Sequence, residues 1–183
     1  MLMIQMAVRT LLETQLATPE AFLPIINRAV YANIQRMGSD KSLTLSLIDC
    51  YPSPLDSSLT VLRMTGQHEE ILVVRQDGQV ERINTTALGF PIGLEEEIND
   101  LINYQEVILQ VGDGIVLYTD GITEALNPEK HQYGVKRLCD VVSHFWSKSV
   151  AEINHAVIAD VRAHLSGDKL KDDITLLVLK KRH

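Results

Sequence analysis

The sequence has few of the features that mark several large classes of protein. Only two cysteines occur, Cys50 and Cys139, without the spacing of a metal-binding motif. This excludes a disulfide-rich secreted domain and favours buried thiols in a reducing cytoplasm, although a single disulfide stays open. No apolar run reaches the roughly 18 residues of a membrane helix. Seventeen basic and 24 acidic side chains give a net charge of −7. We expect neither nucleic acid nor membrane as a partner, since both require a basic surface, whereas an acidic chain suits multivalent cations.

The order of the expected elements indicates an α+β protein with one domain over residues 1–183. Two helices come first, over 2–17 and from Thr18-Pro19 to Met37, although Pro24 allows a later start for the second. Asp77-Gly78 joins two strands and is typical of a tight hairpin turn with positive φ at both residues. Ser149 and Glu152 form a capping box at the start of a late helix. The other expected elements are strands at 43–49, 59–66, 106–110, 114–120 and 174–180, a helix at 134–146 and a loop at 166–171.

Acidic residues stand at the ends of two apolar strands. In "IVLYTDGITEA" (115–125), Asp120 ends the strand and Gly121 lets the backbone turn sharply, while Asp172 and Asp173 open the last strand. If these strands are neighbours, three carboxylates converge, with Glu124 nearby. A divalent cation would relieve their repulsion. Aspartates at strand ends also serve as turn and cap residues, so both interpretations stay open.

Several other residues have structural interpretations. Asp113-Gly114 precedes a strand and is interpreted as a turn, and Trp146 as a packing residue. His68 either approaches a substrate or orders its loop. His131, His144, His155 and His164 share no spacing and are expected on the surface. The serines show no Gly-x-Ser-x-Gly motif, so a serine hydrolase has no support.

Two motifs in order carry a resemblance to a known family. "VGDGIVLYTDGITEALNPEKHQYG" (111–134), followed by "DDITLLVLK" (172–180), resembles the metal-dependent serine/threonine protein phosphatases of type 2C (the PPM family). The similarity is to the bacterial SpoIIE/RsbU branch in particular. "TGQHEEILVVRQDG" (65–78) resembles a hairpin of that branch, with Glu69 and Glu70 in place of prolines. The resemblance extends over essentially the whole chain.

The resemblance implies a fold and a chemistry. The fold is a four-layer α/β/β/α sandwich, with a two-metal centre of Mn²⁺ or Mg²⁺ that activates water for attack on a phosphoserine or phosphothreonine in a protein. Asp120 and Asp172 match catalytic metal ligands, and Gly121 and Asp173 match the same metal site. Glu124 matches an acidic position that acts through water, and His68 is the candidate near the substrate.

One motif of the family has no counterpart in the chain. Its first motif supplies an aspartate that bridges both metals, and Asp40 and Asp49 stand in the wrong context to replace it. We therefore expect a domain that lacks its N-terminal strands, with weak or no activity as an isolated chain. Open sheet edges would favour pairing with another chain, such as a homodimer.

Two functions follow from these expectations. One is a cytoplasmic signalling phosphatase whose substrate is of the anti-sigma antagonist type. The other is an inactive phosphatase-like module that binds a protein or dimerises.

Overall fold

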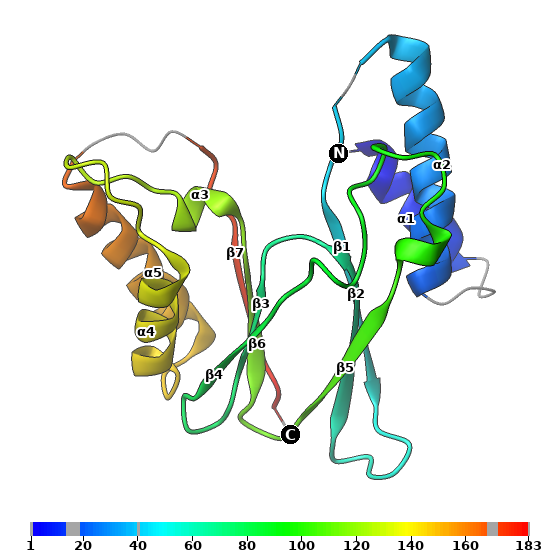
Figure 1. The fold of residues 1–183 in the computed structure, drawn as a ribbon. Helices are drawn as coiled ribbons and strands as arrows, with labels where there is room; N and C mark the ends of the chain where they lie inside the picture. The colour runs from blue at the N-terminus through cyan, green and yellow to red at the C-terminus, as the bar shows by residue number, and fades with distance from the viewer. Residues whose placement is uncertain (1, 14–18, 40, 168–171, 183) are drawn as a thin grey trace. The chain divides into compact units, whose positions relative to one another are not determined.

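The structure is a computed structural model that describes residues 2–13, 19–39, 41–167 and 172–182 (Figure 1). The chain divides into two compact units. The first comprises Met1–Tyr51, Val61–His68 and Thr85–Ile108, and the second comprises Pro52–Thr60, Glu69–Asn84 and Leu109–His183. Each unit contains an antiparallel sheet with its own helices, so the predicted α+β class is confirmed.

The first unit places two helices against a three-stranded sheet. The helices are α1 (Leu2–Glu13) and α2 (Pro19–Met37), and η1 (Asn99–Leu101) is a short 3₁₀ helix. The sheet has the order β1-β2-β5, with β1 at Leu45–Pro52, β2 at Thr60–Gln67 and β5 at Tyr104–Leu109. Its core contains Phe22, Leu23, Ile26, Ile92 and Ile98.

The two N-terminal helices largely follow the prediction. α2 begins at Pro19 and continues through Pro24, so the later start that Pro24 allowed is wrong. Proline removes one backbone hydrogen bond, and the burial of Leu23 and Ile26 beside it offsets that loss. The predicted cap residue Thr18 and the end of the first helix, residues 14–17, lie outside the described residues.

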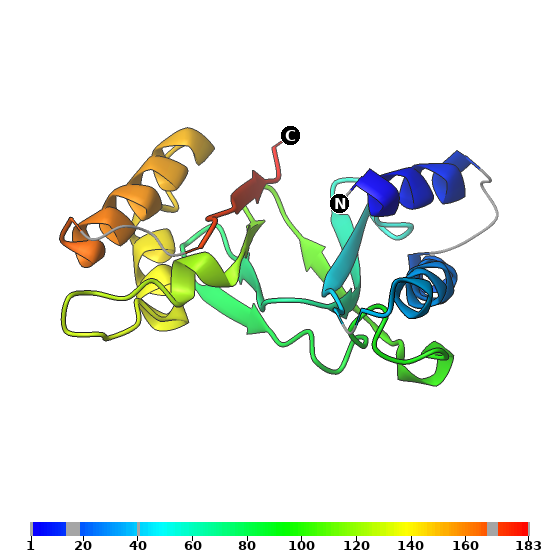
Figure 2. The same cartoon turned by 90° about the horizontal axis from the view of Figure 1, so that it is seen from above.

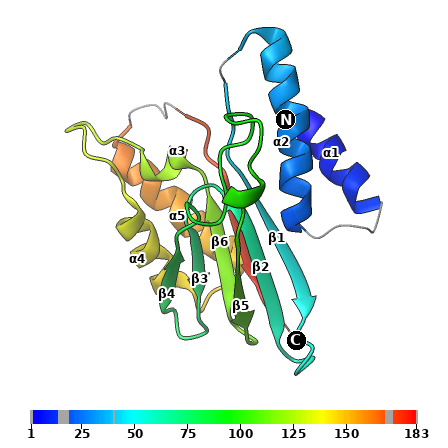
Figure 3. The ribbon, with the colours of Figure 1, turned by 45° about the vertical axis from the view of Figure 1, so that its right-hand side comes forward.

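The second unit contains a four-stranded antiparallel sheet with the order β4-β3-β6-β7. The strands are β3 (Ile71–Val74), β4 (Val80–Ile83), β6 (Gly114–Tyr118) and β7 (Leu176–Lys180). Figure 3 shows β4, β3 and β6 side by side. β6 and β7 pair from Gly114↔Lys180 to Tyr118↔Leu176, so the two apolar runs that carry the acidic motifs are neighbours, and the condition for their meeting is fulfilled.

Helices α4 (Val135–Phe145) and α5 (Val150–Leu165) lie together on one face of this sheet (Figure 2). The predicted capping box is present, since the Ser149 side chain accepts from the Glu152 amide and the Glu152 side chain accepts from the Ser149 amide. The buried stripe of α5 consists of Ile153, Val157, Val161 and Leu165. The predicted loop at 166–171 lies partly outside the described residues.

Trp146 belongs to the same core and is 1% exposed, which confirms its structural interpretation. Its indole Nε1–H donates to the carbonyl of Gly112 at 3.0 Å. The Lys180 ammonium donates to the carbonyl of Trp146 at 2.7 Å and lies 4.9 Å from the centre of the ring. These contacts attach the end of α4 to one end of the β6–β7 pair, where Gly114 lies opposite Lys180.

The hairpin between β3 and β4 differs from the predicted turn. Gly78 has φ of 89°, but Asp77 is not among the residues with positive φ. The amide of Gly78 donates to the carbonyl of Arg75 at 2.8 Å, and the amide of Arg75 donates to the carbonyl of Gln79 at 2.9 Å. The connection is therefore a longer loop with a single left-handed glycine, because Asp77 instead accepts a bond from the Gln79 amide through its side chain.

Two expectations from composition can be compared with the structure. Both cysteines are free thiols, but Cys50 is exposed, which corrects the expectation that both are buried. It lies on β1, where exposed positions predominate towards the end of the strand. None of the helices in the described ranges is long and apolar enough to cross a bilayer.

Candidate functional site

The two acidic motifs meet at one end of the second unit's sheet. Asp120 opens α3 (Asp120–Thr123) just after β6, and Asp172 and Asp173 precede β7. Because β6 and β7 are antiparallel and Tyr118 is opposite Leu176, the last residue of β6 and the first residue of β7 lie at the same end of the sheet. Figure 1 shows α3 at this end of the sheet.

Thr119 joins the two motifs through hydrogen bonds. Its amide donates to the carbonyl of Thr175 at 3.2 Å, and its hydroxyl accepts from the amide of Thr175 at 3.0 Å. The same hydroxyl donates to the carbonyl of Asp173 at 3.3 Å. No role for Thr119 was predicted from the sequence. The available signal was a hydroxyl directly before Asp-Gly at the end of a strand.

Gly121 is required for a different reason than predicted. It lies in α3 and does not have a positive φ, so the expected sharp turn at this glycine is wrong. A Cβ at Gly121 would instead collide with the carbonyl oxygen of Asp173. Glycine is present because the two motif backbones approach closely, a tertiary contact that no local pattern reports.

Asp120 and Asp172 have similar surroundings. Both side chains are exposed, and each carboxylate accepts a bond from the next amide in the chain: Gly121 to Asp120 Oδ1 at 2.9 Å, and Asp173 to Asp172 Oδ1 at 2.8 Å. Asp173 is also exposed. Glu124 is exposed one helical turn after Asp120, and its amide donates to the carbonyl of Asp120 at 2.8 Å.

The oxygen ligands that these residues offer suit a hard divalent cation, but few of them are grouped together. Carboxylate oxygens are the ligands that Mg²⁺ and Mn²⁺ prefer, and the close approach of Gly121 to Asp173 brings the two ligand-bearing segments together. Within the described residues, no three His, Cys, Asp or Glu side chains are grouped so that they could hold a metal ion. The ligand roles of Asp120, Gly121, Asp172 and Asp173 therefore stay predictions.

More acidic side chains surround the same end of the sheet. Glu69 and Glu70 precede β3, which pairs with β6, and Glu70 forms a two-bond ion pair with Arg82 of β4. Burial raises the pKa of the Tyr118 hydroxyl at the end of β6, and the negative charges of Glu69 and Glu70 raise it further. Tyr118 is consequently a neutral, buried side chain at the end of the sheet where these acidic residues lie.

His68 belongs to the first unit. Its amide donates to the Thr85 hydroxyl at 3.0 Å, and that hydroxyl donates to the carbonyl of His68. The imidazole Nδ1 lies 3.1 Å from the hydroxyl of Thr44. These bonds agree with the interpretation that His68 orders its loop, and a role near the substrate stays a prediction.

A polar cluster that was not predicted lies beside the segment that contains Asp120. Tyr133, Arg137, Asp160 and His164 come from a loop and two helices, and their side chains are joined by hydrogen bonds. His164 was expected to be a simple surface residue, but it is partly buried within this cluster. The members are separated by up to 31 positions in the sequence, so only the packing of α4 against α5 reveals them.

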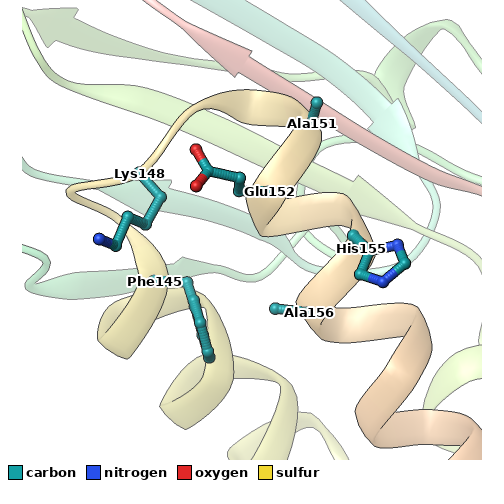
Figure 4. Close-up of a pocket in the computed structure, with 6 residues that line it drawn as sticks. All are labelled: Phe145, Lys148, Ala151, Glu152, His155 and Ala156. Atoms are coloured by element: carbon teal, nitrogen blue, oxygen red, sulfur yellow. The ribbon is translucent and has the colours of Figure 1, made fainter.

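A shallow groove lies elsewhere in the second unit, between the end of α4 and the start of α5 (Figure 4). It is lined by Phe145, Lys148, Ala151, Glu152, His155 and Ala156. The Glu152 carboxylate is already bonded to Ser149 as part of the helix cap. None of the acidic motif residues lines this groove, so it is not the candidate site.

Comparison with known proteins was consistent over nearly the whole chain. Residues 1–182 match the family model described as Stage II sporulation protein E (SpoIIE). Protein IcfG of Synechocystis sp. (strain ATCC 27184 / PCC 6803 / Kazusa) is 26% identical over 112 residues, which cover 61% of this chain and 17% of IcfG.

Two solved structures have a similar fold. The RsbU and RsbW domains of Rv1364c from Mycobacterium tuberculosis match with a TM-score of 0.69 and 21% identity, covering 98% of this chain and 46% of that one. The phosphatase domain of SpoIIE from Bacillus subtilis (Mn presoaked) matches with a TM-score of 0.57 and 16% identity, covering 97% of this chain and 74% of that one. The predicted fold class is thereby confirmed. The chain spans less than half of the Rv1364c structure and a small part of IcfG.

Proposed function

Because the chain belongs to the SpoIIE family, within the SpoIIE/RsbU branch of the type 2C (PPM) phosphatases, we propose that it is part of a metal-dependent phosphatase acting on phosphoserine or phosphothreonine in a protein. The proposed substrate is a small phosphorylated protein of the anti-sigma antagonist type, in bacterial signalling, and the proposed location is the cytoplasm. The similarity to solved phosphatase domains supports the general chemistry, and these finer statements are the proposal.

The observation that carries the proposal is the contact between the two acidic motifs. Thr119 is hydrogen-bonded to both Thr175 and Asp173, and Gly121 leaves no space for a side chain against Asp173. These contacts bring the segments of Asp120 and Asp172 together and leave both carboxylates exposed, unlike the buried and fully bonded carboxylate of Asp113. Asp120 and Asp172, with Asp173, would hold Mn²⁺ or Mg²⁺ from one side, and such an ion supplies an activated water and offsets phosphoryl charge when bound. Glu124 would contact such an ion through a water molecule.

Metal binding tests the proposal directly. Calorimetric titration of the chain with Mn²⁺ should show weak binding that Asp120→Asn removes. Asp77→Asn is the matched control, because Asp77 is also exposed, also precedes a glycine and also accepts a local backbone bond, from Gln79 at 3.0 Å. Equal Mn²⁺ affinity in the wild type and Asp120→Asn would refute the assigned site.

A second function, an inactive phosphatase-like module, is favoured by the ligand geometry. A two-metal mechanism holds its ions about 3.5–4 Å apart and needs a carboxylate between them. Asp120 and Asp172 supply no such bridge in the described structure, where no group of three ligands forms. The module would act by binding a protein or by forming a homodimer, and both partners stay predictions.

The same preparation separates the two functions. Hydrolysis of a phosphoserine protein in excess Mn²⁺ should be very slow with the 183 residues alone, and a segment carrying the family's Asp-Gly motif should restore it. Asp172→Ala should then abolish the restored activity. Fast, Asp120-dependent hydrolysis without that segment would mean that another carboxylate supplies the bridge, and Glu124 and Asp173 would be the first candidates.

A further inference from the structure

The residues after α3 fold back onto the helix that carries Asp120. The segment 125–134, named the return loop here, is closed by a bridge between Leu126 and Gln132. The amide of Tyr133 donates to the carbonyl of Ala125, and the amide of Gly134 donates to the carbonyl of Thr123, both at 2.9 Å. The end of the return loop is therefore bonded directly to the α3 turn.

Asp160 of α5 holds this end of the return loop in place. The hydroxyl of Tyr133, a residue 4% exposed, donates to Asp160 Oδ2 at 2.8 Å. Arg137 in the first turn of α4 donates two hydrogen bonds to the same carboxylate, from Nε at 2.8 Å and from a terminal nitrogen at 3.0 Å. Asp160 thus joins three elements: α5, α4 and the return loop.

The protonation states make these bonds strong. The Arg137 guanidinium lowers the pKa of Asp160, and the Tyr133 hydroxyl lowers it further. Burial raises the pKa of Tyr133, and its bond to Asp160 adds to this. An ionised carboxylate and a neutral phenol give a charge-assisted bond, which is about twice as strong as a neutral one.

His164 adds a second attachment from α5 to the return loop. Its Nδ1 lies 3.1 Å from the Arg137 guanidinium, and its Nε2 lies 3.0 Å from the carbonyl of His131. Guanidinium groups only donate, so Nδ1 accepts and Nε2–H donates to His131. The ring also contacts Tyr133 edge-on, at 5.4 Å between centres.

We infer that Asp160 is a positioning residue for the Asp120 motif. α5 is anchored to the sheet by Ile153, Val157 and Val161, which are fully buried. The bond from Tyr133 to Asp160 fixes Tyr133 relative to α5. The backbone bonds from Tyr133 to Ala125 and from Gly134 to Thr123 then fix the α3 turn relative to the return loop. This inference rests on the proposed function, since it concerns the geometry with which Asp120 receives a divalent cation.

Tyr133→Phe and Asp160→Ala test the inference in the full chain. Both should weaken Mn²⁺ binding by roughly tenfold, the usual effect of losing a partner that orients a metal ligand. Amide hydrogen exchange at Tyr133 and Gly134 should become faster in both. The matched control is Glu152→Ala on the same helix, which removes the side-chain acceptor of the α5 capping box and leaves the bonds of the return loop in place. It should lower the melting temperature but leave Mn²⁺ affinity unchanged.

The outcomes separate this inference from the proposed function. A wild type that binds no Mn²⁺ would overturn both. A wild type that binds, with Tyr133→Phe and Asp160→Ala binding equally well, would overturn only the positioning role. Loss of affinity in Glu152→Ala that matches its loss of stability would also overturn it, because Mn²⁺ affinity would then follow stability and not the return loop. Unchanged exchange at Tyr133 and Gly134 in both variants would show that the return loop is held without Asp160.

Discussion

Two Asp-Gly dipeptides stand at opposite ends of β6, and they do different things. Asp113 is 5% exposed and accepts three bonds, from the amides of Gln76 at 2.8 Å and Gln110 at 3.0 Å and from Arg75 at 3.2 Å. Asp120 is exposed and accepts a bond from the amide of Gly121, the residue next to it. The first carboxylate is used in full by the fold, as predicted for a turn, and the second is accessible to a ligand.

The glycines of the two dipeptides, by contrast, do the same thing. A Cβ at Gly114 would collide with the carbonyl of Leu179, and a Cβ at Gly121 would collide with the carbonyl of Asp173. Both glycines allow the chain at β6 to approach the chain at β7. The glycine of each dipeptide is therefore explained by a close approach of two backbones. The two dipeptides differ only in the bonds that the aspartate side chain accepts, and these bonds distinguish the structural site from the candidate functional one.

The largest effect is expected at the buried dipeptide. Asp113→Ala should lower the free energy of unfolding by about 2–4 kcal/mol, because the amides of Gln76 and Gln110 lose their buried acceptor, while Arg75 keeps its bond to Glu81. Asp120→Ala should change it by less than about 0.5 kcal/mol, as for an ordinary exposed site. Urea titration of the two variants measures both. Similar losses in the two proteins would remove the distinction between the dipeptides.

A smaller loss is expected from Gly121→Val. The added side chain overlaps the Asp173 carbonyl, and the backbone shift should cost about 1–3 kcal/mol and also abolish Mn²⁺ binding. Thr123→Val is the control, since it places the same side chain in the same helix and removes only the 3.3 Å bond from the Thr123 hydroxyl to the backbone carbonyl of Asp120. If calorimetry and melting showed Gly121→Val to be as benign as Thr123→Val, close approach would not explain the glycine.

The smallest effect concerns a third aspartate, Asp160, which is partly exposed but paired. Its folded pKa is below the ordinary value of 3.8 because of Arg137, so its contribution to stability is complete above that value and is lost as the pH falls through the folded pKa. Unfolding of the wild type and Asp160→Ala should differ by about 1–2 kcal/mol at pH 7, and the difference should shrink below about pH 4.

Arg137→Ala provides the control for this pH dependence, because it removes the main cause of the lowered pKa. In that background, the difference made by Asp160→Ala should be smaller at pH 7 and should change less with pH. A difference that stays constant from pH 7 to pH 3 in the wild-type background would contradict the pairing.

Local patterns predicted a large part of the fold and the position of the candidate site. The capping box at Ser149 was predicted correctly because it depends on residues within one helical turn of each other. The two apolar runs with acidic ends were predicted as strands, and their pairing, which the sequence left as a condition, is given by the structure. The hairpin at Gly78 was placed correctly, but its turn type was wrong because the Asp77 side chain changes the local bonding.

What could not be predicted depends on contacts between distant segments. Asp160 and Tyr133 are 27 positions apart, and neither belongs to a motif. The need for Gly121 arises from the backbone of Asp173, 52 positions away, so a local rule gave the right residue for the wrong reason. The number of carboxylates that lie close enough together to bind one ion likewise depends on their positions in space, and the spacing in the sequence could not predict it.

The position of Trp146 has a consequence for optical measurements. It is the single tryptophan of the chain, and it lies in the core of the second unit against Gly112 and Lys180. Indole emission therefore reports on the environment of that unit alone, whereas far-ultraviolet circular dichroism reports on both units. Transitions that coincide in the two signals would mean that the units unfold together, and separated transitions would show that each melts with its own cooperativity.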